Sequence, residues 1–226
     1  MTFAAVPDIA APLILAAGLA CPAAPAPAVT LDFQNTPAQY TSAMTSAQLG
    51  QFKIDTKFSH GPREVFKTGG LTQSNVKTTY KLKTSALNDP NTSQSCAWIE
   101  SISLQVAYEP TVYIASEYPA GSCRYNVTAQ HELRHVNTDV ITLNEYTRDL
   151  QASVQALAAQ MHVRGPFATT NIDRVRDELN QTVANVVQAQ SDTMERRRFQ
   201  RQQLIDTRQE YLRLSGQCPG EPSLLR

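Results

Sequence analysis

The segment His-Glu-Leu-Arg-His at residues 131 to 135 contains the residue types that bind zinc and activate water. Residues four apart on a helix project from the same side, so the imidazoles of His131 and His135 can reach one metal ion. Glu132 lies between them on that side, where its carboxylate can act as a general base. The pattern therefore predicts Zn²⁺ as cofactor and hydrolysis of a peptide or protein substrate.

The continuation of the motif excludes two familiar sources of a third ligand. Metzincins place a glycine and a histidine where this chain has Thr138 and Ile141. Glu145 lies ten residues beyond His135, and on a continuous helix this is about 15 Å, which is too far to share one metal. The third ligand must come from elsewhere in the chain.

A second helix that folds back near Pro166 would bring other carboxylates beside the motif. Glu195, Asp206 and Glu210 are the candidates on this helix, although a regular helix would place all three opposite its apolar stripe. His60, in a loop, is a further candidate.

Three charged residues near the motif have supporting roles in this interpretation. Asp139 is too far from His131 to share its metal, so we expect it to hydrogen-bond a ligand or to pair in the core. Arg201 and Arg208 fall on the apolar stripe of the second helix, where we expect salt bridges between the helices.

The motif requires a helix, and the hydrophobic period supplies one. Around residues 122–126 the period changes from two to about 3.6 and stays helical to about Val163. A second helix is expected from about Ile172 to Leu214. The two would form an antiparallel helical hairpin over residues 123–215.

Residues 31–120 are expected to be rich in β-structure. From Val76 to Lys83 apolar and polar residues alternate, as in a strand with one buried face. Two further strands are expected to join at Glu109-Pro110, and Cys96 and Cys123 lie symmetrically about this turn. The pattern predicts an α+β fold with a small antiparallel sheet and a disulfide between Cys96 and Cys123.

The first 28 residues contain an apolar run and an Ala/Pro-rich stretch, as in a signal peptide. We expect cleavage after Ala28, a single domain over residues 29–226, no stable membrane span after removal of the leader, and a periplasmic or secreted protein. Cys218 would be unpaired without the leader and could join Cys21 only if the leader stayed. Lys+Arg and Asp+Glu both total 20, which argues against nucleic acid as a partner.

The order of these features resembles that of zincin metallopeptidases: a strand over residues 112–116, a short loop containing Cys123, and a helix carrying the motif. More narrowly, the chain is similar, from about Cys96 to Cys218, to a bacterial family of unknown function predicted to be secreted zinc-dependent proteases. This resemblance implies a zincin-like fold whose strand before the helix binds an extended substrate. Residues 203–211 loosely resemble a C-terminal segment of that family, which favours Glu210 or Asp206 as the third ligand.

Two other functions remain open from the sequence. The chain could be a noncatalytic envelope protein whose helical hairpin binds a protein partner, with His131 and His135 on an exposed helix surface. It could also bind zinc for structure alone. Zinc content separates the first alternative from the others, and peptide turnover separates the second from a peptidase.

Overall fold

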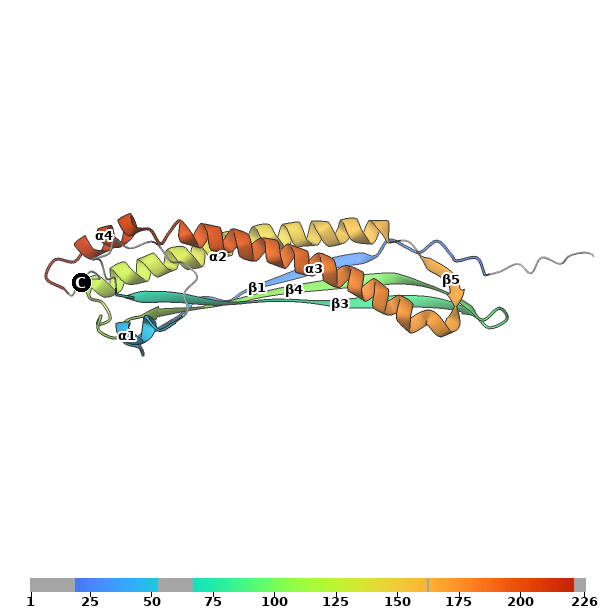
Figure 1. Ribbon diagram of the computed structural model, residues 1–226, viewed down its shortest axis with the longest axis horizontal. Coiled ribbons are helices and arrows are strands. Elements are labelled where there is room, and N and C mark those ends of the chain that lie inside the picture. Colours follow the sequence, from blue (N-terminus) through green and yellow to red (C-terminus); the bar gives the residue numbers. More distant parts are fainter. Residues whose placement is uncertain (1–18, 53–66, 162, 222–226) are drawn as a thin grey trace, which may run out of the picture.

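Two long antiparallel strands form the centre of an elongated molecule, and two long helices cover one face of their sheet (Figure 1). The computed structural model describes residues 19–52, 67–161 and 163–221. The strands are β1 (Ala28–Asn35), β2 (Gln39–Thr41), β3 (Gly70–Asp89), β4 (Gln94–Ile114) and β5 (Arg164–Ala168). The helices are α1 (Ser46–Leu49), α2 (Cys123–Gln160), α3 (Ile172–Gln203) and α4 (Arg208–Gly216), and a 3₁₀ turn, η1 (Thr169–Asn171), precedes α3.

The five-stranded sheet is mixed, which corrects the expected antiparallel sheet. Strand β4 pairs antiparallel with β3 along one side and with β5 on the other. Strands β1 and β2 instead run parallel to β4. The chain forms β1 and β2 first and then runs in the opposite direction through β3. The direction of β1 and β2 relative to β4 depends on how these segments are connected, and the alternation of apolar and polar residues does not encode it.

The expected turn at Glu109-Pro110 is absent, because β4 continues through both residues. Pro110 lies opposite Ser74 of β3. On the other side of β4, pairing with β1 ends at Tyr108 and pairing with β2 begins at Thr111, so neither strand pairs with the proline. A proline is tolerated at such an interruption of the ladder. The hairpin turn lies instead between β3 and β4.

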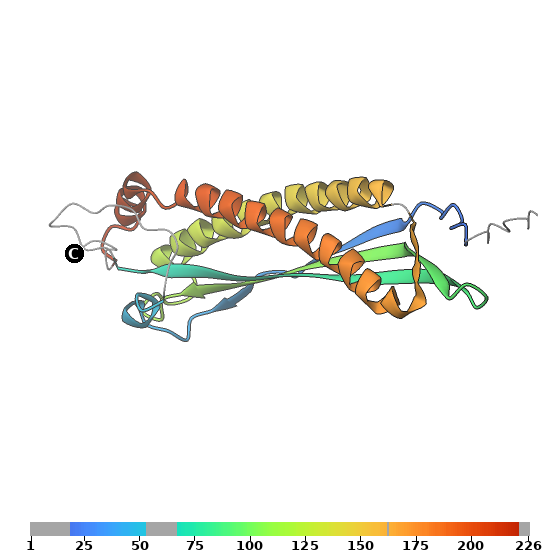
Figure 2. The same cartoon turned by 45° about the vertical axis from the view of Figure 1, so that its right-hand side comes forward.

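The core lies between one face of the sheet and the two long helices (Figure 2). Alternate residues of β4 are buried on this face, including Ile102, Leu104 and Val106. They are part of the same core cluster as the apolar stripe of α2, which includes Leu143 and Leu150. The opposite face of the sheet is more polar, so helix packing on one face accounts for the alternation in the sequence.

Capping side chains set the helix boundaries near the site. Ser122 caps α2, with its hydroxyl accepting a hydrogen bond from the Tyr125 N–H at 3.1 Å. The second helix is not continuous to Leu214 as expected, because α3 ends at Gln203 and α4 begins at Arg208. Thr207 caps α4 by accepting from the Glu210 N–H at 3.2 Å. Because of this break, residues 204–207 do not continue the direction of α3.

The structure contains two disulfides, Cys21–Cys96 and Cys123–Cys218, in place of the expected Cys96–Cys123 bond. Because β4 is unbroken, the 18 residue-to-residue steps from Cys96 to Ile114 span about 60 Å at about 3.3 Å each. Cys96 therefore lies at the end of the sheet remote from the start of α2, and a bond to Cys123 is impossible. Cys218 is paired rather than single.

The Cys21–Cys96 bond also bears on the expected leader at residues 1–28. Residues 1–18 lie outside the described residues, but Cys21 is bonded to β4 and Ala28 begins β1. Cleavage after Ala28 would remove Cys21, so that boundary is incompatible with this disulfide. Two disulfides fit an oxidising compartment. Among the described residues, no helix is long and apolar enough to cross a bilayer.

Candidate metal centre

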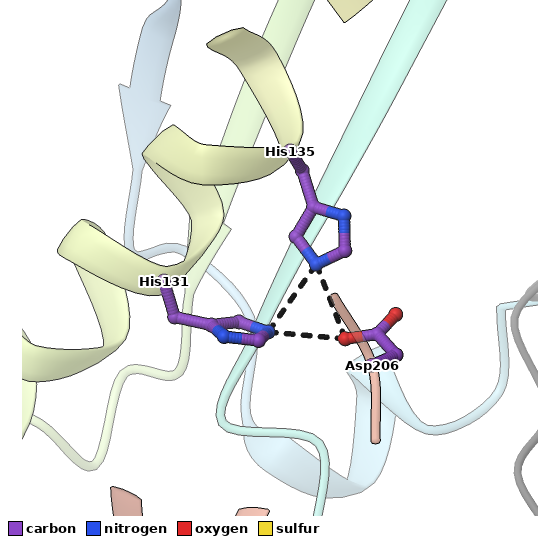
Figure 3. A group of neighbouring side chains, drawn as sticks. All are labelled: His131, His135 and Asp206. Carbon is purple, nitrogen blue, oxygen red and sulfur yellow. Dashed lines mark hydrogen bonds and ion pairs between the residues drawn. The ribbon is translucent and has the colours of Figure 1, made fainter. Parts of the chain in front are cut away.

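Three side chains from two distant parts of the chain meet at one point (Figure 3). His131 and His135 project from the same side of α2, with their Nε2 atoms 3.2 Å apart. Asp206, in the segment between α3 and α4, places Oδ1 3.1 Å from each of these nitrogens. All three residues are buried. Of the two carboxylates favoured as third ligand, Asp206 is therefore the one that faces both histidines.

The tautomer of His135 follows from its partners. Gln202 donates through Nε2 to the His135 carbonyl at 3.1 Å and to Asp139 Oδ1 at 2.5 Å. Its Oε1 must then be the atom that contacts His135 Nδ1, and an amide oxygen only accepts. In the neutral ring the proton then lies on Nδ1, and the lone pair of Nε2 points toward His131 and Asp206. Metal-binding histidines are commonly oriented in this way.

His131 has two competing partners at Nδ1. Glu210 Oε1, which only accepts, lies 3.3 Å away, and Arg134 Nη2, which only donates, lies 2.9 Å away. Arg134 also pairs with Glu210 itself. This ion pair is stronger than a hydrogen bond from the same guanidinium to a neutral imidazole. The Nδ1–H tautomer of the ring would donate to Glu210. It leaves Nε2 of His131 directed at the same point as Nε2 of His135.

Glu210 lies outside this triangle as an anchor for His131. Its pKa is lowered to about 2, chiefly by hydrogen bonds from Arg213 at 2.7 and 2.6 Å, while partial burial opposes the shift. The charge of Arg134 adds to the effect. Glu210 is therefore a fixed anion next to the Nδ1 atom of His131 and does not reach His135.

The triangle of Nε2, Nε2 and Oδ1 has the size of a face of a zinc tetrahedron. With zinc–nitrogen bonds of about 2.0 to 2.1 Å, neighbouring ligand atoms in a tetrahedron lie about 3.3 Å apart. The three edges here measure 3.1, 3.1 and 3.2 Å. Three lone pairs directed at one point repel one another unless a cation or proton lies between them. The donor set of His131, His135 and Asp206 therefore fits zinc.

The pKa of His135 also indicates that its surroundings favour a positive charge. Burial alone would lower its pKa, but the hydrogen bond to Asp206 and the charges of Glu132 and Asp206 together raise the pKa to about 9. Without a metal, a proton on His135 satisfies these carboxylates. A divalent cation in the triangle would replace that proton.

Glu132 lies beside the triangle and is almost fully buried. The Thr72 hydroxyl, from β3, donates to Glu132 Oε2 at 2.9 Å. Burial raises the pKa of Glu132, whereas the neighbouring His135 and His131 and the Thr72 hydrogen bond oppose the rise. A Cβ atom on Gly70 would lie 2.6 Å from Glu132 Oε1, so only a glycine allows β3 this close. This carboxylate is well placed to accept a proton.

Asp139 forms a second buried network one turn beyond His135. Arg198 of α3 donates to both of its oxygens, at 2.7 and 2.9 Å. Ser74 and Tyr108 donate to Oδ2 at 2.9 and 3.2 Å. Asp139 is fully buried, and its Oδ1 accepts from Gln202, which also donates to the His135 carbonyl. Its role in the structure is to hold α2, α3 and the sheet in a fixed relation.

A cavity of about 250 Å³ opens beside the site. Its polar lining includes Glu132, His135 and Asp206, and its apolar lining includes Phe199 and Tyr211. Phe199 is 42% exposed. The Tyr211 ring lies 5.9 Å from that of His131, and burial raises the pKa of its phenol, with Asp206 adding to the effect. An extended ligand entering this cavity would meet both charge and apolar surface.

The structure separates the remaining predicted residues from the triangle. Glu195 is largely exposed, 3.8 Å from Arg198, so it lines the cavity without reaching the histidines. Arg201 forms a salt bridge between the helices with Glu145 at 2.9 Å. His60 lies outside the described residues. His131 is buried because residues 206–211 cover it.

Several residues of the site were missed from the sequence. Thr207 and Glu210 form the Thr-x-x-Glu pattern of a helix start, and this local signal could have revealed the break that turns Asp206 inward. No local signal marks Gln202 or Arg198, which fall within a regular polar helix. The pair Gly69-Gly70 is typical of a loop, although Gly70 begins β3.

Comparison with family models, with curated proteins and with solved structures gives no match for this chain. The interpretation of the site therefore rests on its own geometry and chemistry.

Proposed function

We propose that this protein is a zinc-dependent peptidase of the periplasm or extracellular space, with His131, His135 and Asp206 as metal ligands. The observation that carries the proposal is the convergence of two Nε2 atoms and one carboxylate oxygen beside the buried Glu132. Zinc bound there would polarise a peptide carbonyl and lower the pKa of a water molecule. The two disulfides support the proposed compartment.

Glu132 is the proposed general base. Its carboxylate takes a proton from the attacking water and passes it to the nitrogen of the leaving amine. Thr72 holds Oε2 of Glu132 during this transfer through the hydrogen bond of 2.9 Å. Burial, which raises the pKa of the carboxyl, makes it a stronger base than a solvated glutamate.

The proposed substrate is an extended peptide that lies along the outer edge of β3 near residues 70–74. These residues line the cavity beside Glu132. The strand at residues 112–116 was expected from the resemblance to bind substrate. Its first part is the end of β4, which pairs with β3 on one side and, to Tyr113, with β2 on the other, so it is unsuited to this role. Among the described residues, no strand pairs with the outer edge of β3. Extended peptides commonly add to such an edge.

In the described part of the chain, the apolar stripe of the helical hairpin is not free to bind a protein partner. The apolar stripe of α2, including Val136, Leu143 and Leu150, is already buried in the core. If zinc were bound only for structure, no function would explain why the carboxylate of Glu132 is buried beside the two histidines.

The proposal is tested by zinc content and peptide hydrolysis, measured side by side on five proteins. The variants His131→Ala, His135→Ala and Asp206→Ala should lose zinc and activity. Glu132→Gln should keep zinc and lose activity by about 10² to 10⁴, the usual contribution of a general base. Equal zinc in the wild type and all variants would refute the metal site, and full activity in Glu132→Gln would refute the mechanism.

A further inference from the structure

The C-terminal segment is fastened to the first turn of α2 by a group of contacts that we call the clasp: the Cys123–Cys218 disulfide, Arg124 and Glu221. The disulfide joins α2 to the residues just after α4. Glu221 accepts from the Cys123 N–H at 3.1 Å and from the Arg124 N–H at 2.8 Å. Its carboxylate thereby caps the positive end of the α2 dipole.

Arg124 connects the first turn of α2 to the end of α4. Its guanidinium is fully buried and donates to the carbonyls of Leu214 and Ser215 at 2.7 and 3.3 Å. These carbonyls belong to the last turn of α4, where helical hydrogen bonds run out and a cation is favoured. The clasp therefore exchanges caps between two helices: Glu221 caps the start of α2, and Arg124 caps the end of α4.

The clasp lies at one end of α4 and the proposed metal site lies at the other. Asp206 immediately precedes the cap residue Thr207, and Glu210, in the first turn of α4, contacts His131. Helix α4 is short, so its position over α2 depends on how its two ends are held. Only the clasp holds its C-terminal end by a covalent bond among the described residues.

We propose that the clasp positions Asp206 and Glu210, so that tight zinc binding develops only after Cys123 and Cys218 are joined. The inference rests on the proposed zinc site and adds its regulation. The two thiols lose two protons and two electrons to a disulfide oxidant, which leaves as two thiols. Before this step, in a reducing compartment, the protein would hold zinc weakly and remain inactive. After it, the ligand segment is fixed.

The second disulfide, Cys21–Cys96, provides a control for the loss of the Cys123–Cys218 bond. The Cys21–Cys96 disulfide lies beside Gly165 of β5, at the end of the sheet opposite α4 (Figure 1). It closes a loop of similar length, with a sequence separation of 75 residues against 95 for the clasp. Removing either disulfide should therefore lower the stability of the fold. Only removal of Cys123–Cys218 should also displace the proposed zinc ligands.

The experiment compares the wild type with the double variants Cys123→Ser/Cys218→Ser and Cys21→Ser/Cys96→Ser, all without free thiols that could bind zinc. Zinc affinity is measured by competition with a chromogenic chelator, and folding by circular dichroism. We expect affinity to fall about 10- to 100-fold in the clasp variant, the usual effect of losing support around a metal ligand, and to stay within about twofold in the control. Equal affinity in all three, or equal weakening in both variants, overturns the inference.

A further variant keeps the test decisive if the clasp double variant does not fold. Glu221→Ala leaves both disulfides intact and removes only the carboxylate that accepts from the N–H groups of Cys123 and Arg124, and it should weaken zinc binding several-fold. Unchanged affinity in Glu221→Ala would then overturn the inference. A wild-type protein that binds no zinc would instead refute the proposed function, so the two failures are distinguishable.

Discussion

Gln202 holds His135 at two atoms of the same residue. Its Nε2 donates to the His135 carbonyl at 3.1 Å, and its Oε1 accepts from Nδ1 of the ring. One side chain of α3 therefore fixes both the backbone of α2 and the orientation of the imidazole that it carries. The same amide donates to Asp139, so the imidazole is linked to the buried network between the helices.

Replacing Gln202 by Leu should weaken zinc binding without removing any proposed ligand. The ring of His135 would lose the acceptor that sets its tautomer, and loss of such a partner typically costs about 10- to 100-fold in metal affinity. A chelator competition titration would measure the effect. Gln203→Leu, at the exposed neighbouring position, is the control and should bind zinc as the wild type does.

Asp206 and Glu210 should behave differently when neutralised. Asp206→Asn removes a carboxylate that faces both Nε2 atoms, and we expect the purified protein to contain no zinc. Glu210→Gln removes only the partner of His131 Nδ1, so zinc should remain, with about tenfold weaker affinity. Elemental analysis after dialysis gives the answer. Loss of zinc in Glu210→Gln and retention in Asp206→Asn would reverse the assignment.

Gly70→Ala should reduce activity while zinc content stays unchanged. The new methyl group would lie 2.6 Å from both Glu132 Oε1 and Thr128 Cγ2, so the general base must move. Such overpacking typically costs about 1 to 3 kcal/mol of stability. Gly50→Ala is the matched control, because its Cβ would meet nothing nearer than 3.5 Å. Hydrolysis by Gly70→Ala at the wild-type rate would contradict the proposed role of Glu132.

Arg198→Ala should destabilise the fold far more than Arg197→Ala. Arg198 is bonded to both oxygens of the fully buried Asp139, and breaking a buried pair costs about 3 to 5 kcal/mol. Arg197 pairs with Glu145 and Asp149 in a more exposed position, where pairs contribute about 1 kcal/mol or less. Urea unfolding of both variants would measure the difference. Equal free energies of unfolding would show that Asp139 does not depend on Arg198.

The sequence by itself determined the local part of the site. His131, Glu132 and His135 lie close together because any helix brings residues four apart to the same side, and Ser122 gives that helix its start. The alternation from Val76 to Lys83 likewise specified a strand with one half-buried and one exposed face. These features depend on neighbours within one turn or one strand, which a sequence displays directly.

Only the tertiary structure decided which distant residues complete the site. A break of four residues between α3 and α4 turns Asp206 toward α2, whereas a continuous helix would have pointed it away. The continuity of β4 through Pro110 separated Cys96 from Cys123 and left each to another partner. Strand direction, disulfide pairing and the third carboxylate all depend on which segments pack together. That choice is made by burial of the whole core, and no short stretch of the sequence contains it.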